Sequence, residues 1–284
     1  MPRSTVGVHD RLTEAPGIDL SLARQVLATP ATETIKENRR GRVDRVEIDG
    51  EFFARKHYPL RGARRWLPFL SPSSRARRSW QAARAGSKLG LPLPEPICLF
   101  EGRKETVLVS RWFDGEQFHI WHARRIQQGD IEFNSEVELF RWLGRSIAEV
   151  FTGGFRCSDM APQNLVLAGH PEGPWSFALV DLDDATVDRC PSPQEIEVSL
   201  AQLAHLPPTV SSTCLKRALD SFLAAGGSQL LALPEGKAAL RNLEQRIANE
   251  VSRLQQAKES RMHAKEQEPH RFSGWGLDRS GFPI

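Results

Sequence analysis

Apolar residues recur at helical spacing near the middle of the chain. From Val137 to Val150 they stand three or four positions apart with polar residues between them, which is the pattern of a helix with one buried face. Gly153 and Gly154 follow directly, and they predict the end of this helix. The same kind of pattern predicts further helices at Ile196–Leu206, at Leu215–Ala224 and along a stripe from Leu240 to Leu254.

Strand patterns precede the central helix. Val43–Ile48 alternates between apolar and polar residues, Asp49-Gly50 is a tight hairpin signal, and Glu51–Tyr58 is the predicted partner strand. Ser73–Lys88 is predicted to be a helix with Ser73 or Ser74 as its N-cap. Short apolar runs predict strands at Thr106–Ser110, Leu165–Leu167 and Phe177–Val180, and a hinge is expected at Arg111–Asp114.

Candidate catalytic side chains follow the central helix. Asp159 is followed five residues later by Asn164, and Asp181 stands directly after the strand Phe177–Val180. In phosphoryl transfer one carboxylate orients the attacking hydroxyl, while an amide oxygen and a second carboxylate hold Mg²⁺ on the phosphates. Taken singly, these residues are more simply turn residues and a strand-end cap. Their order of helix, loop, hairpin and Asp instead matches the catalytic and metal-binding segments of kinases.

The strand after the hairpin carries a candidate phosphate-binding lysine. Ala54 and Lys56 are two residues apart, so their side chains share one face of the strand and Arg55 points the other way. The pair matches the Ala-x-Lys of kinases, in which Ala lies by the adenine and Lys grips the phosphates. The preceding loop, Lys36–Gly41, offers one glycine, Gly41, whose backbone is a weaker candidate for covering phosphates.

Charge is unevenly distributed along the chain. Arg55–Lys88 holds ten Lys or Arg residues and no acidic residue, whereas the rest of the 284-residue chain has 28 basic and 35 acidic residues. A field of one sign attracts anions such as nucleotide phosphates, a phosphorylated glycan, an anionic glycolipid or a membrane leaflet. The simpler alternative is a solvated basic face. Aromatic residues are sparse in this window, so no nucleic acid is expected as a partner.

Composition places the chain among ordinary globular proteins. No stretch approaches the ~20 apolar residues of a membrane span, and the first residues lack the apolar core of a signal peptide. The cysteines show neither paired nor metal-type spacing, which predicts free thiols in a reducing compartment. We therefore expect a cytoplasmic protein, with peripheral contact at the inner membrane face. The cysteines are Cys98, Cys157, Cys190 and Cys214.

Several segments resemble the bacterial lipopolysaccharide core kinases, the Kdo and heptose kinases, over roughly Ile35–Gly226. The resemblance implies a protein-kinase-like fold, ATP, Mg²⁺ and a sugar hydroxyl as acceptor. It also suggests Asp183 as a further metal ligand beside Asn164 and Asp181. The segments that carry it are Arg55–Tyr58, Ser74–Trp80, Leu89–Pro96, Cys157–Asn164 and Val180–Asp183.

Two departures from the kinase pattern bear on activity. The predicted helix Ser73–Lys88 contains no Glu, so it cannot form the usual ion pair with the strand lysine; we expect Lys56 to be held by Asp181 or by another acid outside that helix. Cys157-Ser158 stands where the resembled family commonly has His-Arg before the catalytic Asp. The missing His usually braces that loop, so its loss concerns rigidity more than chemistry.

The sequence therefore predicts an α+β, two-lobed, protein-kinase-like fold with a small β-rich lobe and a larger helical lobe. Its expected parts are an extension (1–30), the small lobe (31–112), the large lobe (113–235), and a C-terminal helix and tail (236–284). The expected function is ATP-dependent phosphorylation of a sugar hydroxyl on lipopolysaccharide core or a related glycolipid. The alternatives are an atypical small protein kinase and a nucleotide-binding pseudokinase or scaffold.

Overall fold

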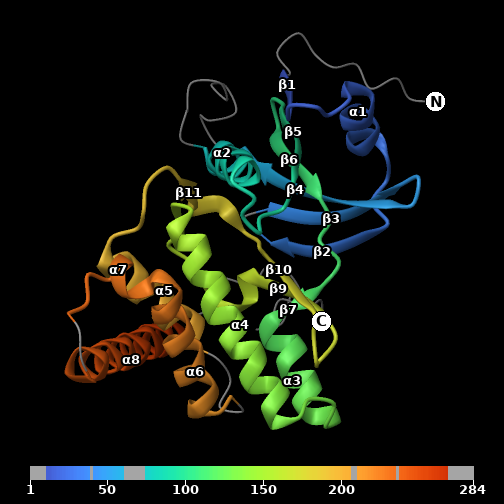
Figure 1. The fold of residues 1–284 in the computed structure, drawn as a ribbon. Coiled ribbons are helices and arrows are strands. Elements are labelled where there is room, and N and C mark those ends of the chain that lie inside the picture. The colour runs from blue at the N-terminus through green and yellow to red at the C-terminus, as the bar shows by residue number, and fades with distance from the viewer. Residues whose placement is uncertain (1–10, 39–40, 61–73, 206–209, 235–236, 268–284) are drawn as a thin grey trace. The chain divides into compact units, whose positions relative to one another are not determined.

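The computed structural model describes residues 11–38, 41–60, 74–205, 210–234 and 237–267. The chain divides into two compact units, Met1–Pro234 and Glu235–Ile284. Figure 1 shows the first unit as a sheet-rich small lobe followed by a mainly helical large lobe. The described part of the second unit is one long helix, α8 (Lys237–Gln267). This helix contains the predicted apolar stripe.

An antiparallel six-stranded sheet, in the order β1-β5-β6-β4-β3-β2, forms the small lobe. The predicted hairpin joins β3 to β4, with positive φ angles of 52° at Asp49 and 81° at Gly50, as a tight two-residue turn requires. Part of the predicted loop Lys36–Gly41 is instead strand, because β2 continues to Asn38. The strands are β1 (Arg11–Glu14), β2 (Glu33–Asn38), β3 (Gly41–Ile48), β4 (Glu51–Pro59), β5 (Pro96–Glu101) and β6 (Glu105–Arg111).

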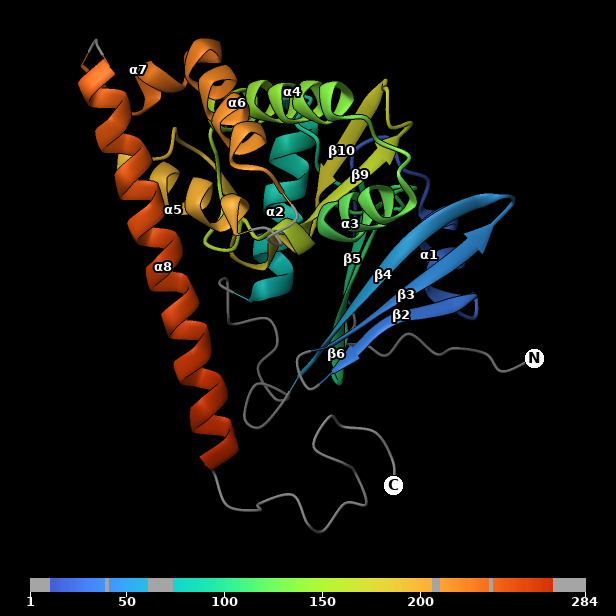
Figure 2. The ribbon, with the colours of Figure 1, turned by 90° about the horizontal axis from the view of Figure 1, so that it is seen from below.

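Two helices cover opposite faces of this sheet. Helix α1 (Leu20–Ala28) packs Ala23 and Val26 into a buried cluster with strand residues such as Phe53. Helix α2 (Arg75–Lys88) packs on the face that also carries Tyr58, and Figures 1 and 2 show the two helices apart from each other. Strand β1 and α1 therefore make the described part of the predicted extension, residues 11–30, part of the small lobe.

The large lobe is built around the predicted central helix, α4. Its Gly144 lies against α6: a Cβ there would come within 2.0 Å of the Ala218 carbonyl oxygen, so the two helices approach closely only because this residue is glycine. Helix α3 and the short strands β7, β8 and β11 were not predicted. The helices are α3 (Phe118–Gln128), α4 (Phe133–Thr152), α5 (Pro193–Ala204), α6 (Ser212–Phe222) and α7 (Ser228–Leu230).

Short strands and turns carry the loops between these helices. Strands β9 and β10 form the predicted hairpin, and β7 extends this small sheet. Strand β8 pairs with β11. Of two 3₁₀ turns, η3 follows Asp159 and includes Asn164, and η4 follows Asp181 and includes Asp183. The bounds are β7 (Glu116–Gln117), β8 (Phe155–Arg156), η3 (Pro162–Asn164), β9 (Leu165–Gly169), β10 (Trp175–Leu179), η4 (Leu182–Asp184) and β11 (Thr186–Val187).

All four cysteines are free thiols, as their spacing predicted. Within the described ranges, no helix has the length and apolar character needed to cross a membrane.

Candidate active site

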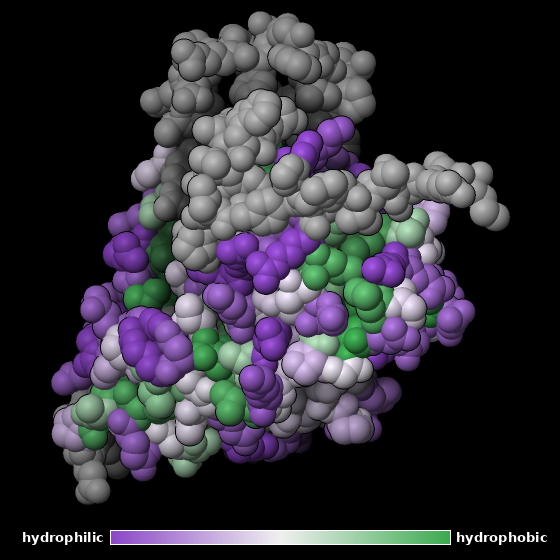
Figure 3. Space-filling view, turned by 90° about the horizontal axis from the view of Figure 1, so that it is seen from above, coloured by the Kyte–Doolittle hydropathy of each residue, from purple (hydrophilic) through white to green (hydrophobic). Residues whose placement is uncertain are grey.

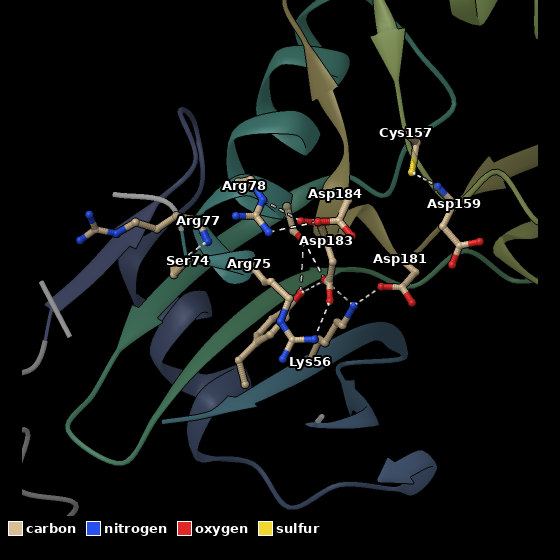
Figure 4. A network of polar contacts seen from close by, with 12 residues as sticks. Lys56, Ser74, Arg75, Arg77, Arg78, Cys157, Asp159, Asp181, Asp183 and Asp184 are labelled. Carbon is tan, nitrogen blue, oxygen red and sulfur yellow. Dashed lines mark hydrogen bonds and ion pairs between the residues drawn. The ribbon is translucent and has the colours of Figure 1, made fainter. Parts of the chain in front are cut away.

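Lys56 on β4 points toward the loop that follows β10. Its amine Nζ lies 2.5 Å from Asp181 Oδ1 and 2.7 Å from Asp183 Oδ1, and Figure 4 shows the lysine between these two carboxylates. Two expectations are confirmed: Lys56 faces inward, as the strand pattern predicted, and acids outside α2 hold it, as the absence of Glu from that helix predicted. Burial by itself lowers the pKa of Lys56, but the neighbouring oxygens of Tyr58, Asp183 and Asp181 outweigh it and raise the pKa above its ordinary value.

Arg55 takes the opposite side of the same strand. Its Nη1 donates to the carbonyl oxygens at the end of α1, those of Val26 at 3.1 Å, Leu27 at 3.2 Å and Thr29 at 2.9 Å. Its Nη2 donates to Asp44 at 3.4 Å. A cation at the C-terminal end of a helix satisfies free carbonyls and complements the helix dipole. Arg55 is thus a buried structural residue that fastens α1 to the sheet.

The loop that carries Asp159 is braced from α5. The Gln202 side chain donates to the Ser158 carbonyl at 2.8 Å and accepts from the Met160 backbone N–H at 2.7 Å, so it grips the loop on both sides of Asp159. The Asp159 N–H also donates to Cys157 Sγ at 3.5 Å. Gln202 thereby provides a brace in a loop that lacks the usual His. Sequence reasoning missed it, because nothing local marks a glutamine 43 residues from Asp159.

Cys157 adds no charge to this loop. Burial raises the pKa of its thiol to about 11, so the side chain is protonated at neutral pH. The Asp159 carboxylate is exposed, and in Figure 4 Asp181 is drawn between Asp159 and Lys56. The loop therefore presents an exposed carboxylate on the side of the lysine and its acids.

A backbone hydrogen bond holds the segment of Asn164 beside the residue that precedes Asp181. The Val180 N–H donates to the Asn164 carbonyl at 2.8 Å, and Asn164 Nδ2 donates to the Asp159 carbonyl at 3.0 Å. Because the amide nitrogen is engaged, Oδ1 is the atom that Asn164 can offer to a ligand. Asp181 has a left-handed backbone with φ 61° and ψ 58°, a costly conformation for a residue other than glycine and one that clusters at functional sites.

The Asp183 carboxylate has more protein contacts and is less exposed than that of Asp181. Its carboxylate contacts Lys56, Tyr58, Ser79 and Arg75, and its side chain is 16% exposed against 39% for Asp181. Among the described residues, no cluster of three or more His, Cys, Asp or Glu side chains is placed to hold a metal. The sequence also suggested Asp183 as a metal ligand, but the structure shows its oxygens occupied by donors from the protein.

The remaining predicted nucleotide residues lie in the small lobe. Ala54 shares the inner face of β4 with Lys56, as expected. Gly41 begins β3 with φ 154°, and a Cβ there would meet the His57 carbonyl oxygen at 2.2 Å. The described contacts therefore explain this glycine by its close approach to β4.

Arg45 is a further residue on the inner face that sequence reasoning missed. It pairs in register with Ala54, so the two side chains share that face. Its guanidinium carbon lies 3.9 Å from the Phe52 ring centroid and 5.2 Å from that of Trp112. An Arg held over two aromatic rings is a cation–π arrangement. It places a cation beside Ala54 and next to the predicted hinge.

Five of the ten cations in the basic window contact acids within the fold, Arg55 with Asp44 among them. Lys56 and Arg75 reach the acids of the metal loop, Arg77 binds Glu101 at 2.6 Å, and Arg78 binds Asp184 at 3.1 Å. Where Figure 3 is not grey, hydrophilic and hydrophobic residues are interspersed. Of the other five cations, Arg84 lies over the Trp80 ring and Lys88 is exposed, while Arg61, Arg64 and Arg65 lie outside the described residues.

Comparison with solved structures matches this architecture to kinases. WaaP, in a complex with acyl carrier protein, superposes with a TM-score of 0.58 at 16% sequence identity, covering 84% of this chain and 99% of that one. The chain has a two-lobed kinase-like fold. The autoinhibited serine kinase domain of titin also matches, with a TM-score of 0.43 at 11% identity over 77% of this chain and 73% of that one. The sequence itself matches no protein-family profile and no curated protein.

Proposed function

We propose that this protein is an ATP-dependent phosphotransferase. The observation that carries the proposal is the contact between Lys56 on β4 and Asp181 after β10, 125 residues apart in sequence, beside the loop that presents Asp159 and Asn164. A cation and a metal-binding carboxylate that meet across two lobes are the parts that hold the phosphates in kinase-type phosphoryl transfer. The kinase-like fold supports the same reading.

The donor set fits ATP with Mg²⁺. Asp181 offers a partly exposed carboxylate and Asn164 an amide oxygen, and hard cations prefer such oxygen ligands. Mg²⁺ is commonly held by one or two protein groups together with phosphate oxygens and water, so these two side chains suffice. When bound, Mg²⁺ would neutralise charge on the phosphates. Ala54 and Gly41 are the proposed contacts of the nucleotide in the small lobe, with Lys56 on its phosphates.

Asp159 is the proposed catalytic residue. Its carboxylate is exposed and Gln202 fixes the backbone on either side of it, so it can receive or orient the proton of an acceptor hydroxyl. Catalysis of this kind depends mainly on positioning and electrostatic stabilisation. The bracing by Gln202 supplies the rigidity that such positioning needs.

We propose a sugar hydroxyl of lipopolysaccharide core, or of a related anionic glycolipid, as the acceptor. WaaP is a lipopolysaccharide core heptose kinase, and the local segments from Arg55 to Asp183 resemble the same family. An acceptor in the inner leaflet would place the protein at the cytoplasmic face of the membrane.

The first experiment is a thermal-shift titration with ATP, with and without Mg²⁺, followed by turnover on purified core glycans stripped of phosphate. We expect stabilisation by ATP that depends on Mg²⁺, and phosphate transfer to the glycan. Transfer to a protein instead would favour an atypical protein kinase. Nucleotide binding with no transfer to glycan, lipid or protein would favour a pseudokinase and overturn the proposal.

Neighbouring residues on β4 offer a matched pair of substitutions. Lys56→Met should reduce turnover by about 10²-fold or more, because it removes charge stabilisation at the phosphates, while the unfolding temperature changes little. Arg55→Met should leave turnover nearly unchanged and lower the stability of the fold. It removes one partner of a buried ion pair, which lowers the free energy of unfolding by about 3–5 kcal/mol. We expect the lower end of this range, because Asp44 keeps Arg42 and His57 as partners.

Turnover and chemical denaturation of both variants, measured well below their unfolding temperatures, separate the two roles. A loss of turnover in Arg55→Met with an active Lys56→Met would reverse the assignment.

The basic window gives a test of the proposed glycolipid surface. Changing Arg61, Arg64 and Arg65 together to Gln should weaken binding to vesicles that contain anionic glycolipid and leave ATP binding intact. Binding by the unchanged protein should fall with added salt, since exposed charges are screened over ~8–10 Å at physiological ionic strength. Sedimentation with vesicles at two salt concentrations measures both effects.

The control carries the same change in charge at exposed positions elsewhere, namely Arg24, Arg103 and Lys104 changed to Gln. Equal losses in both triple variants, or binding that ignores salt, would show that this window is only a solvated basic face. Arg77 and Arg78 are left unchanged because their ion pairs hold α2.

A further inference from the structure

Asp183 lies where two lobes and three elements meet. Its Oδ1 accepts from Lys56 on β4 at 2.7 Å, from Tyr58 on the same strand at 2.7 Å, and from Ser79 on α2 at 3.1 Å. On the other oxygen, Arg75 Nη1 of α2 approaches Oδ2 to 3.6 Å. Figure 4 shows the contacts of Lys56 and Arg75 converging on this carboxylate. Asp183 therefore connects the lysine strand, the helix and the loop that carries Asp181.

The backbone of the same turn is also tied to α2. Arg78 Nε donates to the Asp183 carbonyl at 3.0 Å, and Arg78 Nη2 donates to Asp184 Oδ1 at 3.1 Å. Helix α2 packs directly against η4 and β11. The turn after Asp181 and the helix thus form one connected polar unit.

Helix α2 has no carboxylate of its own. Its sequence, RARRSWQAARAGSK, contains neither Asp nor Glu, so it cannot supply an acidic partner for Lys56. We propose that Asp183 is the positioning residue that couples α2 to Lys56, supplying from the metal loop the carboxylate that the helix lacks. The inference rests on the proposed phosphotransferase function. It gives Asp183 a role different from that of a metal ligand.

The contacts of the two acids support this division of roles. A carboxylate has about four lone-pair sites, and donors from Lys56, Tyr58 and Ser79 occupy Asp183 Oδ1 while Arg75 faces Oδ2. A divalent cation at Asp183 would have to displace these donors and approach two positive side chains. Asp181 is more exposed, and among the described residues its carboxylate contacts Lys56 alone, so it is the acid that can turn to a metal.

The proposal has a structural consequence for α2. Because η4 follows Asp181 directly, any arrangement that places Asp181 in the site also holds the helix and the lysine. Helix α2 then reaches its position beside Lys56 together with the turn, and no further movement of the helix is needed.

The test moves the carboxylate from the loop to the helix in the full-length protein. The Ser79 hydroxyl and the Lys56 amine both contact one oxygen of Asp183, at 3.1 and 2.7 Å. A Glu side chain at position 79 is long enough to reach from α2 to the Lys56 amine. The variants are therefore Asp183→Ser, Ser79→Glu and the double exchange. Asp184→Ser is the matched control, because it removes the neighbouring carboxylate, which binds Arg78, whereas Lys56 is held by Asp181 and Asp183.

We expect Asp183→Ser to lower kcat by about 10²-fold, the loss that a misplacement of ~1 Å can cause, with KM for ATP and the Mg²⁺ requirement changed less than about threefold. Hydrogen exchange of amides 75–88 should become roughly tenfold faster, because the helix loses a tether. The double exchange should restore at least tenfold of the lost kcat and slow the exchange again. Asp184→Ser should stay within about threefold of the unchanged protein in kcat, because Arg78 Nε still ties α2 to the turn through the Asp183 carbonyl.

Two results would overturn the inference. One is a raised Mg²⁺ requirement in Asp183→Ser with unchanged exchange in α2, which identifies a metal ligand. The other is a double exchange that recovers neither kcat nor protection, which leaves Asp183 with a purely local role. Hydrogen exchange needs no turnover, so a protein that transfers no phosphate would defeat the proposed function while this measurement still decides the coupling.

Discussion

Asp159→Asn is expected to remove phosphate transfer almost completely while nucleotide binding persists. A positioned acid–base group contributes about 10²–10⁴-fold to a rate, and kcat should decrease by a factor in that range. ATP affinity should change little, because the phosphates and the metal are assigned to other groups, namely Lys56, Asn164 Oδ1 and Asp181, and the contacts of residue 159 in the fold use its backbone. Initial rates on core glycan and equilibrium titration with ATP measure the two quantities separately.

The substitution also keeps the loop intact, because the Asn164 and Cys157 contacts use the backbone of residue 159. Gln202→Ala is an informative companion, since it leaves the carboxylate but removes the brace on both sides of it. We expect a smaller loss of kcat there. An Asp159→Asn enzyme with full turnover would show that the acceptor hydroxyl is activated elsewhere.

Asp181→Ala is expected to abolish the Mg²⁺-dependent part of stabilisation by ATP. A ligand at about 100 times its Kd stabilises a protein by roughly 2.7 kcal/mol, and this gain should disappear in the variant. The fold should survive, because Asp181 is 39% exposed and Lys56 keeps Asp183 as a partner. Thermal unfolding with ATP, with and without Mg²⁺, gives the comparison.

Asp184→Ala serves as the control, since it removes an acid from the adjacent turn. It should retain the Mg²⁺-dependent shift. If Asp181→Ala gains the same shift as the unchanged protein, the metal is held by other residues and the assignment of Asp181 fails.

Local patterns were sufficient for much of the architecture. Alternation along β4 placed Lys56 and Arg55 on opposite faces, because successive side chains of a strand point to opposite sides. Periodicity located α4, and Ser74 was correctly one of the two N-caps proposed for α2. The loop Lys36–Gly41 was partly wrong, because β2 gains its pairing from β3 rather than from an apolar pattern of its own: all six of its residues are exposed.

Contacts between distant segments escaped sequence reasoning. Gln202 reaches the loop of Asp159 from α5, and Arg55 reaches the end of α1, 26 to 29 residues earlier. The acid-free window from Arg55 to Lys88 predicted a basic face. In the fold, its cations meet acids 11 to 127 residues away, so much of that charge is used internally.

By itself the sequence determined the order of elements, the inward lysine and the presence of Asp159, Asn164 and Asp181 on successive loops, because these depend on spacing along a few neighbouring residues. Only the tertiary structure decided how the site is held together. It brought Asp183 against Lys56 and Ser79, and Gln202 against the loop of Asp159. Such pairings depend on how the lobes and helices pack, and no local pattern records the distance between side chains more than 40 residues apart.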